Sequence, residues 1–195
     1  MLERLFHNWV YGGFLSAFIF IGFGFAFLEN TPLLVLLIYL HLPIYQLHQF
    51  EEHDRDRFRQ YMNREIGGGL EILTPAAVFV INIFGVWILF AVLISLAYLI
   101  NPGWGLGVVY GTLFNAIIHI AAALKSRSYN PGAITAVVLF LPLSLSALIL
   151  ALQNNQIVWA DQIVGLAIGV GLHVIIIVFC AARMKRLKKI SILKA

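Results

Sequence analysis

One short stretch of the chain combines three histidines with two adjacent carboxylates. Its centre is the string HQFEE at residues 48–52, which ends an apolar segment. On a helix, Glu51 and Glu52 fall on either side of His48, one turn further on. Imidazole nitrogens and carboxylate oxygens on one face could bind Zn²⁺ or Fe²⁺, or they could form an acid–base pair. The alternative is that both carboxylates are solvated at a membrane interface and paired with Arg55.

Two later apolar segments each carry a histidine at the end of a row of small residues. The rows, at four-residue steps, are Gly107, Gly111, Asn115 and His119, and then Gly165, Gly169 and His173. Such steps trace an inclined ridge on a helix, and glycines along it let another helix approach closely. We therefore expect His119 and His173 to face protein. The simpler interpretation is that His119 and Asn115 only bond between helices and that His173 is a satisfied core histidine.

These histidines are expected at overlapping depths in a membrane. At helical rise, His119 lies ~8 Å before the end of its apolar segment, and His48 lies ~10 Å before Arg55. His173 lies ~15 Å before the first basic residue of the C-terminal tail. An Asn-Pro-Gly turn at residues 130–132 is expected on the same side. The pattern predicts one shared polar site, with this turn in a position to cap it.

With these residues laid out, the chain resembles the HXXEE-domain family of small multi-span membrane proteins. Residues 48–52 carry the motif, and the resemblance extends to Asn115 with His119, to the turn at 130–132 and to His173. The resemblance implies a metal-binding or enzymatic site and says little about the substrate.

The rest of the chain indicates the scaffold that would hold this site. Of the 195 residues, 61% are hydrophobic and 11% are charged, whereas a soluble domain has about 45–50% and about 25%. Six apolar stretches approach the ~20 residues that cross a bilayer; they are 9–28, 32–52, 75–100, 104–124, 133–152 and 162–182. Turn-forming residues lie between them. We predict an all-α, polytopic bundle of about six transmembrane helices that forms one domain over residues 1–195.

The basic residues predict how the bundle is oriented. All 13 lysines and arginines fall in four segments, which are 1–8, 53–74, 125–132 and 183–195. The opposite loops carry only Glu29 and Asp161. By the positive-inside rule, both termini are expected in the cytoplasm of a multi-pass protein of the cell membrane. His7, His53 and the Lys-rich tail are expected in water or against anionic headgroups. The net charge of +4 then reflects topology and predicts no nucleic-acid partner.

The leading functional hypothesis is a membrane-embedded, metal-dependent enzyme that acts on a lipid-like or other hydrophobic molecule at the cytoplasmic side. The predicted cofactor is a divalent metal, with Zn²⁺ favoured and Fe²⁺ compatible. The predicted ligands are His48, Glu51, Glu52, His119 and His173. A carboxylate that does not bind the metal would act as a base, and Asn115 and Asn130 would orient ligands or substrate. The single cysteine, Cys180, excludes an internal disulfide or a thiolate cluster.

Three other functions stay open at this point. One is a metal-free isomerase or cyclase in which Glu51 or Glu52 works with a histidine as acid and base. Another is a proton-coupled transporter that uses the same residues as a relay, although no inverted repeat of the polar motifs is visible. The last is haem b held between His119 and His173, which would leave the carboxylates without a task.

Overall fold

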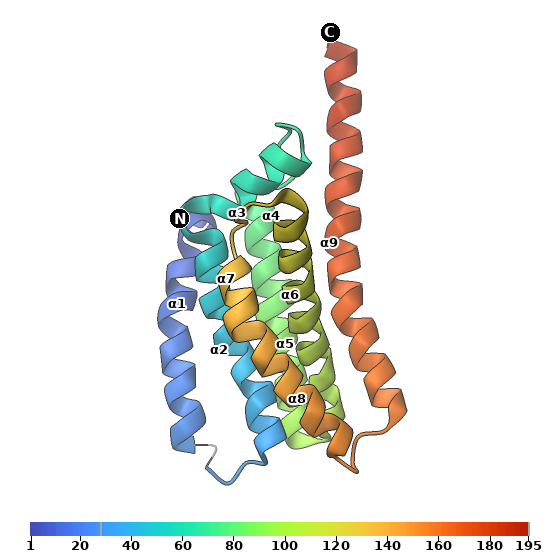
Figure 1. The fold of residues 1–195 in the computed structure, drawn as a ribbon. Helices are drawn as coiled ribbons and strands as arrows, with labels where there is room; N and C mark the ends of the chain where they lie inside the picture. Colours follow the sequence, from blue (N-terminus) through green and yellow to red (C-terminus); the bar gives the residue numbers. More distant parts are fainter. Residues whose placement is uncertain (28, 195) are drawn as a thin grey trace.

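Six long helices make up the fold, as the hydropathy pattern predicts (Figure 1). The computed structural model describes residues 1–27 and 29–194, and no strand occurs within them. The spans are α1 (Leu2–Phe27), α2 (Leu33–His53), the run α4 (Pro75–Val80), η3 (Ile81–Ile88) and α5 (Leu89–Leu99), α6 (Leu106–Ser126), the run α7 (Ala133–Thr135), η5 (Ala136–Phe140) and α8 (Leu141–Gln153), and α9 (Trp159–Lys194). Each is long and apolar enough to cross a membrane.

Both termini lie at the same end of the bundle, together with the segments after α2 and α6 (Figure 1). We call this the basic end, because every lysine and arginine falls in the segments that the sequence assigns to it. Turn residues stop the helices as expected. Asn101 accepts a hydrogen bond from the Gly103 amide at 2.7 Å and begins a short 3₁₀ turn, η4 (Pro102–Gly105). Thr74 caps α4 by accepting from the Ala77 amide at 3.1 Å.

Helix α2 is the central element of the bundle, since it packs against α1, α5, α6 and α8. Its polar residues are accordingly buried in protein and do not face lipid. His41, His48 and Gln49 are fully buried, and Glu52 is 5% exposed. Burying several polar side chains of one helix inside a membrane protein costs free energy. Such residues therefore usually mark a functional site.

The glycine ridges of α6 and α9 pack against each other, as their spacing predicts. A Cβ atom added to Gly169 would overlap the backbone of Gly111, and one added to Gly165 would overlap Leu106. Only glycine permits this approach. The glycines of the two ridges form this contact. His119 and His173 lie further along the same ridges, toward the basic end.

The chain bends sharply directly after α2 at η1 (Asp54–Asp56), where Arg55 and Asp56 have φ values of 53° and 63°. It continues through α3 (Arg57–Tyr61) and η2 (Met62–Ile66). We call residues 57–73 the cap segment. Asn63 closes its loop by bonding the amide and the carbonyl of Leu73, both at 2.9 Å. Arg183 donates from Nε to the Glu71 carbonyl at 3.0 Å and ties the cap segment to α9.

Candidate metal centre

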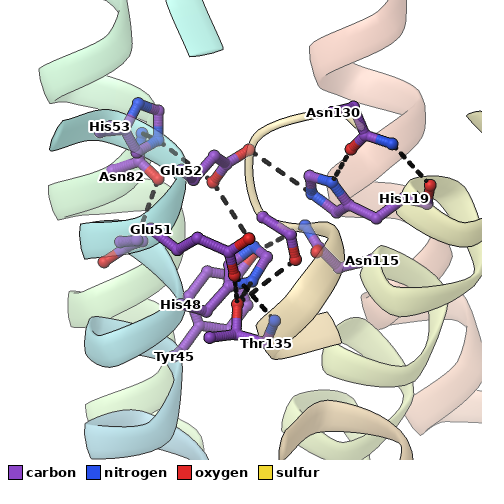
Figure 2. Close-up of polar contacts among 12 residues, drawn as sticks. Tyr45, His48, Glu51, Glu52, His53, Asn82, Asn115, His119, Asn130 and Thr135 are labelled. Carbon is purple, nitrogen blue, oxygen red and sulfur yellow. Dashed lines mark hydrogen bonds and ion pairs between the residues drawn. The ribbon is translucent and has the colours of Figure 1, made fainter. Parts of the chain in front are cut away.

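The side chains of His48, Glu52 and His119 meet between α2 and α6 near the basic end (Figure 2). One ligand atom from each lies within 4.8 Å of the other two. His48 Nε2 is 3.6 Å from Glu52 Oε2, and His119 Nε2 is 3.6 Å from Glu52 Oε1. All three side chains are buried. The carboxylate therefore bridges two imidazoles on different helices.

The tautomer of His48 follows from its contact with Thr135. His48 Nδ1 lies 2.8 Å from Thr135 Oγ1, and Thr135 Oγ1 lies 2.5 Å from Glu51 Oε2. An ionised carboxylate only accepts, so the one hydroxyl proton of Thr135 goes to Glu51. Thr135 must then accept from His48 Nδ1–H. His48 Nε2 is left with a lone pair, is buried, and has no hydrogen-bond partner in the described part of the chain.

The tautomer of His119 is set in the same way by Asn130. The amide nitrogen of Asn130 donates to the His119 carbonyl at 2.9 Å, which leaves its Oδ1 as the atom 2.7 Å from His119 Nδ1. His119 Nδ1 therefore carries the proton and donates it to Asn130. The Nε2 lone pair of His119 faces Glu52.

In the neutral form of both imidazoles, these contacts leave three electron-pair donors facing one another. A contact of 3.6 Å is too long for a charge-assisted N–H···O hydrogen bond of about 2.7–2.9 Å. Two ligands on one tetrahedral ion, each ~2.0–2.2 Å from the metal, lie ~3.3–3.6 Å apart. The two spacings between Glu52 and the imidazoles therefore match those of ligands on one divalent cation, and the histidine and carboxylate donors suit Zn²⁺ or Fe²⁺.

The Asn-Pro-Gly turn forms one wall of this group. Gly132 has φ +97°, and a Cβ atom there would lie 2.7 Å from Cε1 of both His48 and His119. The position therefore requires glycine for its backbone conformation and for the space that the two imidazoles occupy. With Asn130 bonded to His119, the turn holds both rings from one side.

The two adjacent carboxylates have different partners. Glu51 does not join the three-residue group within the described structure. Its carboxylate accepts from the amides of Ile134 and Thr135 at the start of α7, at 3.1 and 2.7 Å, and from the Tyr129 hydroxyl at 2.8 Å. Partial burial and the Glu51 carboxylate raise the pKa of the Tyr129 phenol, which keeps it protonated as a donor. Glu51 therefore positions Thr135 and, through it, His48.

His53 lies inside the protein, and the expectation that it sits in water or among headgroups is wrong. It is 7% exposed, its ring packs on Trp9 and Phe58, and its Nε2 is 3.2 Å from Glu52 Oε2. The same nitrogen lies 3.4 Å from the Asn82 amide nitrogen. His53 is the last residue of α2, and helical periodicity alone does not predict that Trp9 of α1 and Phe58 of α3 cover its ring.

A chain of hydrogen bonds supports that side of the group. Trp87 donates to Gln49 at 2.5 Å, and Gln49 donates to Asn82 at 2.7 Å. Asn82 also donates to the Val78 carbonyl at 2.8 Å. Asn82 thus joins the third span to α2 by a hydrogen bond. The sequence contains no signal for Thr135 or Gln49, since such residues are common in spans and their role depends on the residues that face them.

The other two predicted site residues lie beside the group. Asn115 donates to the Tyr45 hydroxyl at 3.0 Å, and its Oδ1 is buried without a partner in the described chain. His173 Nδ1 donates to the Gly169 carbonyl at 2.9 Å, so its Nε2 also has a free lone pair. His173 is not part of the three-residue group. It lines the same cavity as Glu52, His119 and Asn115.

This cavity has a volume of about 410 Å³ and adjoins the group. Most of its wall is apolar and comes from the cap segment, the third span, α6 and α9. Its polar wall consists of Tyr45, Glu52, His53, Tyr61, Asn82, Asn115, His119, Asn130 and His173. A mostly apolar pocket with a few converging polar groups is the usual form of a small-molecule site.

Comparison with known proteins gives a family and no described activity. A family model described as a protein of unknown function with HXXEE motif matches residues 39–147, which is more than half of the chain. The matched range contains the three-residue group and the turn at 130–132, and it ends before His173. No curated protein and no solved structure matches.

Proposed function

This chain belongs to the HXXEE family, and we propose that it is a metal-dependent enzyme of the membrane that acts on a hydrophobic molecule. The observation that carries the proposal is the meeting of three lone pairs at His48, Glu52 and His119 beside an apolar cavity. By the positive-inside rule, the site lies toward the cytoplasmic side.

The metal would be held by Nε2 of both histidines and by the Glu52 carboxylate. Such a set of two histidines and one carboxylate leaves coordination positions open, and a divalent ion there supplies a Lewis acid. Glu52 and His119 line the cavity, so an ion held by them would adjoin a molecule bound there. Thr135 and Asn130 hold the imidazoles in the ligating tautomer.

The neighbouring side chains can handle protons and orient a substrate. His53 Nε2 is 3.2 Å from Glu52 and lines the cavity, which suits it to pass a proton to or from a bound molecule. Asn115 presents an unpartnered Oδ1 that can accept a hydrogen bond from a substrate hydroxyl. The apolar wall keeps water away from the reacting group.

Metal analysis of the gently purified full chain tests the cofactor. We expect close to one divalent ion per chain in the wild type and none in the His48→Ala/His119→Ala double variant. His41→Ala is the matched control, because it removes a buried histidine from the same helix outside the group. Equal metal content in the wild type and the double variant would rule out this cofactor site.

Product analysis tests the enzymatic part. The wild type and Glu52→Gln would be incubated in parallel with a total lipid extract, and the extracts compared by mass spectrometry. We expect a mass change in some lipid species with the wild type alone. Identical extracts would leave a metal site without the proposed activity.

A specific contact also favours a metal-free variant of this enzyme. The 3.2 Å pair of His53 and Glu52 is an acid–base arrangement at the cavity wall, suited to isomerisation or cyclisation. The lipid-extract experiment in excess chelator separates the two. Activity that is lost with chelator and restored by Zn²⁺ or Fe²⁺ supports the metal enzyme, whereas full activity in chelator supports the acid–base enzyme.

A further inference from the structure

The cavity opens sideways between the basic halves of α6 and α9. Residues that line the cavity and are also exposed on the outer surface mark its mouth. They include Ile118 on α6, at 37% exposed, and Ile177 on α9, at 57%, with the exposed Ala181 one turn further along α9. Ile66, at the end of η2, is 53% exposed and lines the cavity too. The mouth is therefore bordered by apolar side chains on three elements.

The glycine seam explains why the two helices separate here. At Gly111 and Gly169 the backbones are in close contact. The next residues on each ridge are larger, and His119 and His173 follow on the cavity wall. On its other side α9 contacts the third span, since Leu172 lies 3.4 Å from a Cβ atom added to Gly85. The exposed lining residues Ile118 and Ile177 instead border the side of α9 that faces α6.

The depth of the mouth places it in hydrocarbon. Ile118 precedes Lys125 by seven residues, and Ile177 precedes Arg183 by six, so both lie ~9–10 Å inside the basic boundary. The headgroup region of a bilayer is only about 5–8 Å thick on each side. A molecule that enters between Ile118 and Ile177 therefore comes from the lipid phase.

The lining of the cavity also indicates which polar head group the bound molecule can carry. No lysine or arginine is among the described residues that line it. Without them, a phosphate or carboxylate head would depend on the metal ion alone, and the Glu52 carboxylate on the cavity wall repels it. The polar wall instead offers histidines and asparagines that suit a hydroxyl or carbonyl oxygen. A volume of about 410 Å³ lies near the lower end of the range for small-molecule pockets, which suits one chain better than a diacyl lipid.

From these observations we infer that the substrate of the proposed enzyme is a neutral, single-chain amphiphile, such as a long-chain alcohol, aldehyde or ketone, which enters from the bilayer between Ile118 and Ile177. This inference rests on the proposed function for its chemistry, and on the cavity for its binding. The head would lie against Glu52 and His119, with the chain along the apolar wall.

Cys180 provides a direct reporter of occupancy. It is the only cysteine of the chain and lines the cavity. Full-length protein in nanodiscs would be treated with N-ethylmaleimide, and the rate of alkylation followed by intact mass. We expect hexadecanol to slow the alkylation at least tenfold, and hexadecyl phosphate or a diacylglycerol to change it less than twofold. The Cys180→Ser/Val178→Cys variant is the control, since Val178 is exposed outside the cavity and hexadecanol should leave its rate unchanged.

Variants of the mouth test the entry route. Ile118→Trp should slow alkylation of Cys180 by a bulky, membrane-soluble maleimide, whereas the neighbouring Ile117→Trp should not, because Ile117 is exposed but does not line the cavity. Equal rates in both variants would overturn lateral entry.

The outcomes separate this inference from the proposed function. No protection by hexadecanol, or equal protection by the phosphate, overturns the inference even when the metal content is as expected. Protection by hexadecanol in a protein without metal supports the binding site and overturns the metal-dependent function.

Discussion

Two buried histidines on α2, His41 and His48, differ in only one respect that matters. Both are fully buried, and they lie two helical turns apart. His41 Nδ1 donates to the Leu37 carbonyl of its own helix at 2.7 Å, and its Nε2 accepts from the Ser144 hydroxyl at 3.3 Å. The His41 region is thus self-sufficient, which means that both ring nitrogens have a hydrogen-bond partner within the protein.

Among the described residues, His48 has no counterpart of the Ser144 hydroxyl, which donates to Nε2 of His41. His48 Nδ1 is bonded to another helix at Thr135, and its Nε2 faces Glu52 with no proton donor. The comparison teaches that burial and residue type do not distinguish a structural histidine from a candidate ligand. What distinguishes them is whether the second nitrogen meets a donor or another acceptor.

The largest expected effect separates the two adjacent carboxylates. Glu52→Gln should reduce metal binding below detection, because it removes the charge that faces both lone pairs. Glu51→Gln should weaken the metal affinity by about 10–100-fold, as expected for a residue that positions a ligand. Metal titration of both purified variants measures the difference. The assignment of roles fails if the two variants lose the same affinity.

A change at Gly132 should rank next. Gly132→Ala forces both imidazoles to move, so we expect the metal affinity to fall by more than ~100-fold. Gly68→Ala is the control, since Gly68 also has a positive φ, at +60°, but nothing lies within 4 Å of its added Cβ. Titration of both variants, with thermal unfolding in parallel, distinguishes displacement of the rings from backbone strain. Similar affinities in the two variants would argue against a role of Gly132 in the site.

Removal of the Thr135 hydroxyl should have a moderate effect. Thr135→Val frees His48 to change tautomer, and we expect a loss of about 10–100-fold in metal affinity. Thr135→Ser keeps the hydroxyl and should restore most of the affinity. Valine and serine variants that bind equally well would show that the side chain only fills space.

The smallest effect is expected in the self-sufficient region. Ser144→Ala removes the partner of His41 Nε2 and should cost about 1 kcal/mol of stability, as for other hydrogen bonds between membrane helices. Metal content should stay unchanged. Unfolding in detergent and metal analysis of the same sample test both statements, and a loss of metal would break the distinction between the two regions.

The sequence predicts much of this arrangement along each helix. Runs of apolar residues predict the six spans, because a helix needs about 20 such residues to cross the hydrocarbon. The helix also pairs all backbone amides and carbonyls internally, which lipid cannot do. Four-residue steps of glycine predict the close approach of α6 and α9. Periodicity and rise also bring His48 and His119 to similar depths, and the structure places their rings 5.0 Å apart.

Other features were decided only by how the helices are rotated and tilted against one another. Glu51 and Glu52 are equivalent in sequence, yet one lies on the start of α7 and the other between two imidazoles. His53 lies inside because Trp9 of α1 and Phe58 of α3 pack on its ring. His173 lines the same cavity as Glu52 and His119 but does not join their group within the described residues. A helix repeat determines which side chains share a face, whereas the partner of each face depends on contacts between segments far apart in the chain, and these exist only once the bundle has packed.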